Sequence, residues 1–123
     1  MNYYEHRLGD FSPSAKRRNL PAVYVLATPD FEYIKVGKST ALKQRMINVQ
    51  SGCPFDLSLW LVIRTPRASE IEAHVHQSLN HCHVRGEWFN PAKRDLDRLV
   101  SFFVDTNQHI ADVHAKANIN EVC

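Results

Sequence analysis

Two short β-forming runs joined by a brief polar link constrain this chain more than any other feature. The first run is Val23–Thr28 (VYVLAT), which Pro29-Asp30 stops, and the second is Tyr33–Gly37. The link, T-P-D-F-E, is short and therefore predicts an antiparallel hairpin. A third run, Leu57–Arg64 (LSLWLVIR), is apolar on both faces over part of its length, which is typical of a central strand.

Three further segments have apolar residues at helical spacing, and a loop is expected over His81–Glu87. The first predicted helix is capped by Ser39 or Thr40, and its apolar positions are Leu42, Met46 and Val49. The second covers Ala68–Leu79. The third begins at Asn90-Pro91 and ends near Asp105.

The order of elements is therefore β-β-α-β-α-α. This order predicts an α+β fold, with a small three-stranded antiparallel sheet flanked by helices. We expect one domain over residues 21–105, preceded by a basic N-terminal arm (1–20) and followed by a C-terminal extension (106–123) of weaker periodicity. A chain of 123 residues is long enough for one such domain with a modest core.

Composition narrows the class of protein. Apolar residues make up 44% of the chain and charged residues 23%, and no apolar run is long enough to span a membrane. The N-terminus lacks the order of a signal peptide, and Cys53, Cys82 and Cys123 are an odd set at no familiar spacing. We therefore expect an intracellular, cytoplasmic protein without a disulfide framework.

The net charge of +2 says little, but the basic residues are unevenly distributed. Between residues 16 and 45 there are seven basic residues but only two acidic ones, Asp30 and Glu32. Such an excess suits a polyanion such as nucleic acid, although a solvated basic face would look the same. The basic residues of this stretch are Lys16, Arg17, Arg18, Lys35, Lys38, Lys43 and Arg45.

Several short segments between residues 22 and 89 form an ordered set: Ala22-Val23-Tyr24, Lys35-Val36-Gly37, Arg45, Glu72 with His76, and Gly86-Glu87-Trp88-Phe89. Together they resemble the GIY-YIG nuclease superfamily, in particular its branch common in phages and mobile elements. In that branch an E-x-x-x-H helix is followed by G-E-W-F. The chain departs from the family pattern at Ala22, and at Lys35, which stands in place of the second tyrosine.

The resemblance implies a metal-dependent endonuclease that hydrolyses DNA phosphodiester bonds. Tyr24 would act as general base or position the water, with its pKa lowered by neighbouring lysines. Arg45 and Lys35 would bind the phosphate, for which the planar guanidinium is well shaped. Glu72 would hold one Mg²⁺ or Mn²⁺, and His76 would relay a proton or hold the phosphate.

Residues near these positions suggest additional phosphate contacts. Lys35 and Lys38 flank Gly37, whose missing side chain would let a phosphate approach the backbone. A capped helix after a tight turn would explain the same residues. The predicted nucleic-acid contacts are Lys38, Ser39, Lys43, Arg67 and Arg85.

Other acidic and aromatic residues receive lesser roles. Glu70 competes with Glu72 for the metal, but the register of the family motif favours Glu72. Glu87 is expected to be a structural hydrogen-bond partner, with Trp88 and Phe89 as core anchors. A zinc site is a weaker hypothesis, because the histidine-rich cluster does not have a common zinc spacing. That cluster is His74, His76, His81, Cys82 and His83.

Two other functions stay open. One is a non-catalytic nucleic-acid-binding or regulatory protein that retains the fold, which the loss of the second tyrosine supports. The other is a protein-binding module that uses the sheet surface around Trp60. The sequence does not distinguish single-stranded, duplex or branched DNA, or DNA from RNA. A chain this short would need a homodimer, a protein partner or a preference for structured or single-stranded DNA to find its target.

Overall fold

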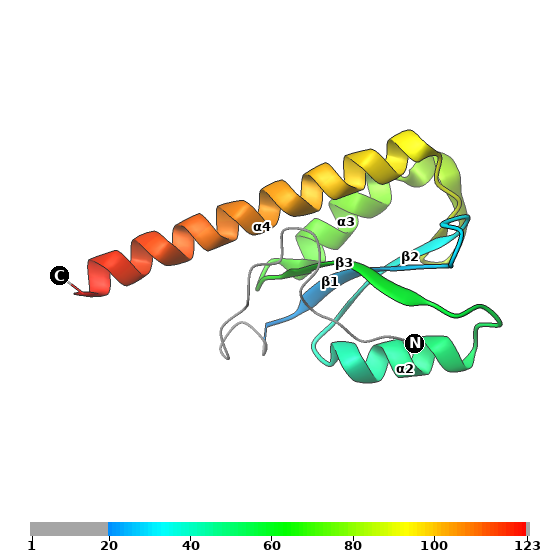
Figure 1. The fold of residues 1–123 in the computed structure, drawn as a ribbon, viewed down its shortest axis with the longest axis horizontal. Coiled ribbons are helices and arrows are strands. Elements are labelled where there is room, and N and C mark those ends of the chain that lie inside the picture. Colours follow the sequence, from blue (N-terminus) through cyan, green and yellow to red (C-terminus); the bar gives the residue numbers. More distant parts are fainter. Residues whose placement is uncertain (1–19, 123) are drawn as a thin grey trace.

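The computed structural model describes residues 20–122, with side chains described as far as Val113 (Figure 1). The predicted N-terminal arm therefore lies outside the described residues, apart from Leu20. No described helix combines the length and the hydropathy that crossing a membrane requires. The elements are β1 (Ala22–Ala27), β2 (Ile34–Ser39), α2 (Leu42–Ser51), β3 (Ser58–Arg64), α3 (Ala68–Ser78), the 3-10 helix η1 (Asn80–Cys82), β4 (His83–Arg85), β5 (Trp88–Phe89) and α4 (Lys93–Val122).

The α+β class is confirmed, but the sheet has five antiparallel strands, in the order β3-β1-β2-β5-β4, instead of three. The hairpin of β1 and β2 forms as predicted. The loop predicted over His81–Glu87 is wrong, because β4 and the start of its hairpin with β5 occupy this segment. Gly86 makes the turn with a φ of 54°, in the left-handed region that glycine adopts without strain.

Strand β3 lies at an edge of the sheet, not at its centre as predicted. Its apolar residues are nevertheless buried on both sides: Leu61 and Ile63 belong to the core under α3 and α4, and Leu59 and Val62 to the core under α2. Helix α4 also covers this edge region, since Asn107 Nδ2 donates a 2.9 Å hydrogen bond to the Val62 carbonyl. Apolar residues on both faces of a strand therefore indicate that helices cover both faces. An edge strand can be covered in this way as well as a central one.

Helices cover both faces of the sheet (Figure 1). Helices α3 and α4 lie over one face, and α2 lies over the other. Because side chains alternate along a strand, Val23 and Val25 of β1 pack under α3 and α4, whereas Tyr24 packs under α2. Tyr24 and the residues of α3 thus approach the sheet from opposite sides.

Helix α2 begins at Leu42, and its N-cap position is Ala41, so the predicted capping by Ser39 or Thr40 is wrong. The hydroxyl of Ser39 is used just before the helix, where Oγ accepts a 2.9 Å hydrogen bond from the N–H of Ala41. No side chain caps the start of α2, because alanine offers no oxygen.

Helix α4 differs from its prediction at both ends. It begins at Lys93, later than Asn90-Pro91, and it continues past Asp105 to residue 122. At the start, Asp95 Oδ2 accepts a 2.9 Å hydrogen bond from the N–H of Ala92. At the other end, no glycine or proline follows residue 105 to stop the helix. The last turns of α4 extend beyond the sheet (Figure 1).

Candidate metal and phosphate site

The candidate site lies at the edge of β2, next to the point where β5 begins. Within β2, strand β5 pairs only with Ile34 and Lys35. One further backbone contact follows, a 3.0 Å hydrogen bond from the N–H of Val36 to the carbonyl of Glu87. Beyond Val36, no strand of the described chain lies on this side of β2. Side chains from the two faces of the sheet can therefore meet around this edge.

Gly37 provides the opening through which Tyr24 reaches the edge. The two residues are direct partners in the register of β1 and β2. A Cβ at Gly37 would lie 2.6 Å from Tyr24 Cζ and 3.1 Å from Glu87 Oε1, closer than side chains tolerate. The expectation that a phosphate approaches the Gly37 backbone is therefore wrong on this face, because the phenol occupies the space.

Tyr24 is fully buried, and its hydroxyl has no hydrogen-bond partner among the described residues. Burial and then the negative charge of Glu87 raise the pKa of this phenol, while Arg45 lies close enough to act in the opposite direction without reaching hydrogen-bonding geometry. The predicted lowering of the Tyr24 pKa is therefore wrong. A phenol that keeps its proton donates a hydrogen bond well but is a poor general base.

Three side chains able to bind a metal ion converge beside this phenol: Glu72 and His76 of α3, and Glu87 of the β4–β5 turn. One ligand atom from each lies within 4.8 Å of the others. Glu72 and His76 share a helix face because they are four residues apart. Glu87 joins them because the pairing of β5 with β2 carries the turn to α3. Its 2.8 Å ion pair with Lys35 also makes it the structural hydrogen-bond partner that we expected. We call these three residues the acidic cluster.

The electrostatics of the acidic cluster favour a bound cation. Burial and the charge of Glu87 raise the pKa of Glu72, although His76 and Lys38 act to lower it. Oε2 of Glu72 is buried and has no hydrogen-bond partner in the described structure. Two neighbouring carboxylates repel each other unless a proton or a cation lies between them. Two carboxylates and an imidazole suit Mn²⁺, and the carboxylate oxygens also suit Mg²⁺.

Two contacts fix the orientation of the His76 ring. Its Nε2 lies 2.8 Å from the carbonyl oxygen of Val36, and its ring meets Phe89 edge-on at 5.2 Å. Because a carbonyl only accepts hydrogen bonds, Nε2 carries a proton, and Nδ1 is the ring nitrogen that could bind a metal ion. Metal-binding histidines commonly donate their second N–H to the backbone in this way.

The two lysines that flank Gly37, Lys35 and Lys38, are engaged by other side chains. Lys35 Nζ forms a 2.8 Å ion pair with Glu87 and lies 5.8 Å from the centre of the Trp88 ring, and its side chain is only 14% exposed. Lys38 Nζ donates a 2.6 Å hydrogen bond to Ser69 Oγ. Lys35 therefore neutralises Glu87 in this structure.

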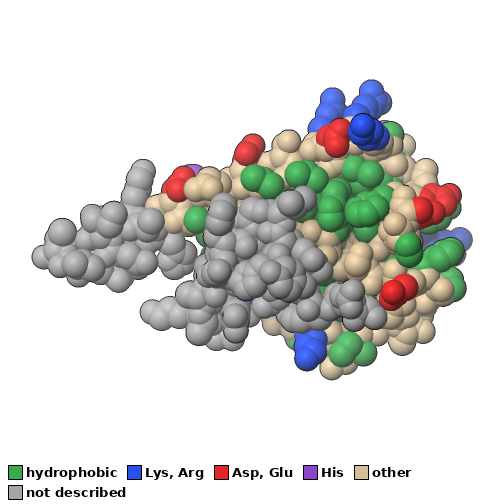
Figure 2. Space-filling model, viewed as in Figure 1, with side chains coloured by type: hydrophobic (Ala, Val, Ile, Leu, Met, Phe, Trp, Pro, Cys, Tyr) green, Lys and Arg blue, Asp and Glu red, His purple; other side chains and the backbone are tan. Residues whose placement is uncertain are grey.

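The structure thus brings Tyr24, Lys35, Glu72 and His76 together around Glu87, and it places Arg45 beside Tyr24. The remaining predicted contacts are more scattered. Lys43 lies on the exposed side of α2, and Arg85 is on β4. Arg67 directly precedes α3 and forms a 2.7 Å ion pair with Glu70 of that helix. On the face shown in Figure 2, described Lys and Arg side chains stand in separate groups, the largest over the first turns of α4.

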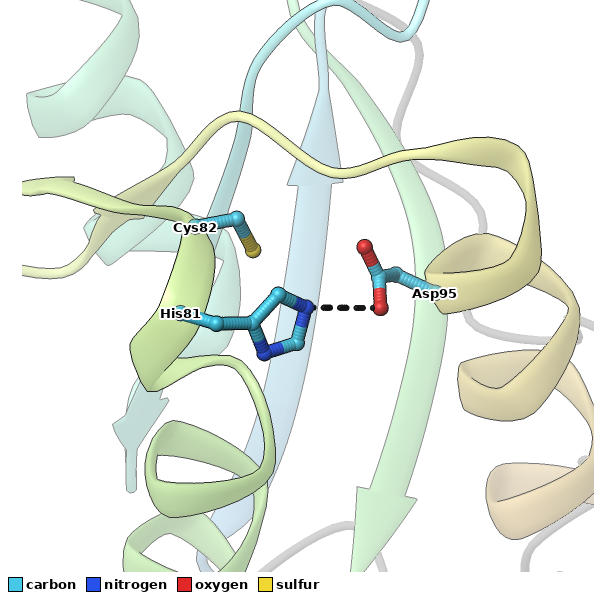
Figure 3. Close-up of side chains that lie close together, drawn as sticks. All are labelled: His81, Cys82 and Asp95. Atoms are coloured by element: carbon cyan, nitrogen blue, oxygen red, sulfur yellow. Dashed lines mark hydrogen bonds and ion pairs between the residues drawn. The ribbon is translucent and has the colours of Figure 1, made fainter.

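The histidines of the zinc hypothesis do not converge. His74 lies against Phe102, with ring centres 5.1 Å apart, and His83 Nε2 lies 2.8 Å from the Gly86 carbonyl. His76 belongs to the acidic cluster. Only His81 and Cys82 of this set lie together, with Asp95 of α4 (Figure 3).

The group formed by His81, Cys82 and Asp95 is explained by protein contacts. His81 Nε2 lies 2.9 Å from Asp95 Oδ1, while the other carboxylate oxygen caps α4. The thiol of Cys82 donates to the Leu79 carbonyl at 3.2 Å, and burial together with the charge of Asp95 raises its pKa. Zinc binds the thiolate, so binding here would require this thiol to lose its proton and its hydrogen bond to Leu79. The group instead links η1 to the start of α4.

Comparison with protein families matches residues 22–104 to the T5orf172 domain. The chain belongs to the T5orf172 domain family. This is a different family from GIY-YIG, so the resemblance inferred from the motifs is wrong, although both occur in phage and mobile-element nucleases. The T5orf172 domain family is a nuclease-like, DNA-binding family. Comparisons with curated proteins and with solved structures gave no match.

The T5orf172 domain of this chain contains the whole described sheet, helices α2 and α3, and the first turns of α4. Every residue of the acidic cluster, as well as Tyr24 and Arg45, lies within it. The candidate site is therefore formed by residues of the domain itself.

Proposed function

We propose that this T5orf172 domain is a metal-dependent endonuclease that hydrolyses phosphodiester bonds of DNA. The observation that supports this most is the acidic cluster, in which a buried oxygen of Glu72 has no protein partner among the described residues. Leaving such an oxygen unsatisfied costs free energy, and a bound ligand would remove that cost. A divalent cation is the ligand that also relieves the repulsion between the two carboxylates.

Glu72, Glu87 and a ring nitrogen of His76 would hold the ion, either Mn²⁺ or Mg²⁺. When bound, the ion would supply positive charge at the scissile phosphate and so ease departure of the leaving oxygen. Lys35 supports this arrangement from outside the cluster, because its ion pair holds the Glu87 carboxylate in place.

Tyr24 and Arg45 would act on the phosphate from the α2 side. Arg45 is exposed in the first turn of α2, and its planar fork matches two phosphate oxygens. The Tyr24 hydroxyl keeps its proton and would donate to a phosphate oxygen or position the attacking water. A fixed donor of this kind typically contributes on the order of 100-fold to 1,000-fold in rate.

The test is incubation of the purified chain with plasmid and with single-stranded DNA, in Mg²⁺, in Mn²⁺ and in chelator. We expect cleavage that requires the ion and that falls roughly a thousandfold, about 4 kcal/mol of activation free energy, in Glu72→Gln. Glu70→Gln is the matched control, because Glu70 is on the same helix but exposed and outside the acidic cluster. It should cleave like the wild type.

Two results would contradict the proposal. Cleavage that persists in chelator or in Glu72→Gln would show that the acidic cluster does not hold the catalytic ion. DNA binding without any cleavage, unchanged by metal, would instead favour a non-catalytic DNA-binding protein.

A further inference from the structure

A groove of ≈ 620 Å³ opens on the α2 face of the sheet, next to the candidate site. Its walls come from the C-terminal part of α2 with the loop that follows, from β2, and from the β4–β5 hairpin. Its volume lies in the range of sites that hold small organic groups. The lining includes three aromatic side chains and two cations: Tyr33, Phe55, Trp88, Lys35 and Arg85.

The wall of the groove that carries Phe55 is fixed by Gln50. Its Nε2 donates a 2.8 Å hydrogen bond to the carbonyl of Phe55, and its Oε1 accepts one of 2.8 Å from the N–H of Leu57. Phe55 is 52% exposed, and Val84 of the hairpin wall is 53% exposed. A pinned loop that presents a large apolar side chain to solvent beside an apolar groove is typical of a binding surface.

The groove and the candidate site share two neighbouring elements. Lys35 lines the groove, and its Nζ pairs with Glu87 of the acidic cluster at 2.8 Å. Trp88 follows Glu87 directly in the chain and lines the groove as well. A polymer bound at the acidic cluster would therefore pass the mouth of the groove.

We propose that this groove binds an unpaired nucleobase of the DNA strand whose phosphate lies at the acidic cluster. The proposal rests on the proposed function, because it specifies the form of DNA that the same site receives. Bases stack on aromatic side chains regardless of sequence, and Arg85 is an exposed cation that complements the backbone phosphates. A base in an intact duplex is already stacked and paired, so the groove favours single-stranded, frayed or mismatched DNA.

The test measures binding in chelator, so that cleavage plays no part. The probes are a short fluorescein-labelled oligothymidine and a fully paired hairpin of the same length. We expect Phe55→Ala to raise the Kd for oligothymidine roughly tenfold and the Kd for the hairpin less than twofold. Ile47→Ala is the matched control, since Ile47 is also 52% exposed and lies on α2 but does not line the groove.

A second measurement reports on the groove directly. The chain has two tryptophans, so a Trp60→Phe variant leaves Trp88 as the only source of tryptophan fluorescence. Oligothymidine should quench its fluorescence, and Phe55→Ala and Arg85→Ala should each shift the quenching to higher oligothymidine concentration.

The outcomes separate this inference from the proposed function. If the Phe55→Ala variant binds oligothymidine as tightly as the wild type does, the groove does not receive an unpaired base. The same conclusion follows if the substitution weakens the binding of oligothymidine and of the hairpin equally. If binding depends on Phe55 and Arg85 but no DNA is cleaved in any metal, the groove assignment stands and the hydrolytic function fails. If cleavage depends on Glu72 while Trp88 is not quenched, only the groove assignment is overturned.

Discussion

Tyr24 and Gly37 are direct partners across β1 and β2, and the ring of Tyr24 lies where a side chain at position 37 would be. This relationship allows a side chain from the α2 face to approach Glu87 and Glu72, which lie at the edge of β2. Glycine is therefore needed at position 37 to make room for the Tyr24 ring. It is not needed to let a phosphate approach the backbone.

Gly37→Ala should displace the Tyr24 ring and damage both stability and activity. Adding a methyl group against a fully buried ring typically costs about 1–3 kcal/mol of unfolding free energy. Urea denaturation would measure this loss. Gly52→Ala is the control for stability, because the nearest atom to an added Cβ there is a backbone oxygen at an ordinary 3.9 Å. Equal stabilities of the two variants would show that Tyr24 can move aside without cost.

Glu72→Gln should raise the melting temperature of the metal-free protein near neutral pH, although it removes activity. Burial and the charge of Glu87 raise the pKa of Glu72 above its usual 4.5, so ionising this group in the folded state costs stability. The cost is absent below about pH 4.5, grows as the pH rises toward the folded-state pKa, and is constant above it.

Thermal unfolding in chelator at several pH values would test this prediction. The advantage of Glu72→Gln over the wild type should be present near pH 8 and should disappear near pH 4. Glu70→Gln, on the exposed side of the same helix, should show no such pH-dependent gain. A constant difference at all pH values would mean that the charge of Glu72 is not the cause.

Asp95→Ala should destabilise the protein by about 1–2 kcal/mol, as loss of a helix cap does. Burial acts to raise the pKa of Asp95, but the hydrogen bond from Ala92 and the contact with His81 outweigh it and hold this pKa below 3.8. The ionised form therefore stabilises the fold above about pH 4, and this contribution is lost as the pH falls through the lowered pKa.

Urea denaturation of Asp95→Ala at neutral pH and in acid would measure the effect of this cap. The difference from the wild type should shrink in acid. Asp97→Ala, an exposed aspartate of the same helix, should stay within about 0.5 kcal/mol of the wild type.

Local sequence patterns predicted the parts of the fold that depend on neighbours in the chain. The hairpin of β1 and β2 and helix α3 follow from alternation and helical spacing, and both are confirmed. Strands β4 and β5 have three and two residues, too few to show alternation, and they are held by pairing with β2. The edge position of β3 could not be predicted either, because an apolar pattern on both faces of a strand does not show which strands pair with it.

The sequence predicted most of the residues of the candidate site, but not how they are arranged around one another. Glu72 and His76 are visible as a pair because they lie on one helix face. Glu87 was not recognised as their neighbour, because its position depends on β5 joining β2. The raised pKa of Tyr24 was also missed, because it arises from burial and from Glu87, neither of which the local sequence shows.

The central claim is that Glu72, His76 and Glu87 together hold one divalent cation, and Mn²⁺ binding followed by electron paramagnetic resonance tests it most directly. We predict that the wild type and Glu70→Gln bind one Mn²⁺ per chain with the same affinity in the absence of DNA. Glu72→Gln and Glu87→Gln should each weaken this binding by about tenfold or more. Binding that is absent from the wild type, or equal in all four proteins, would contradict the account.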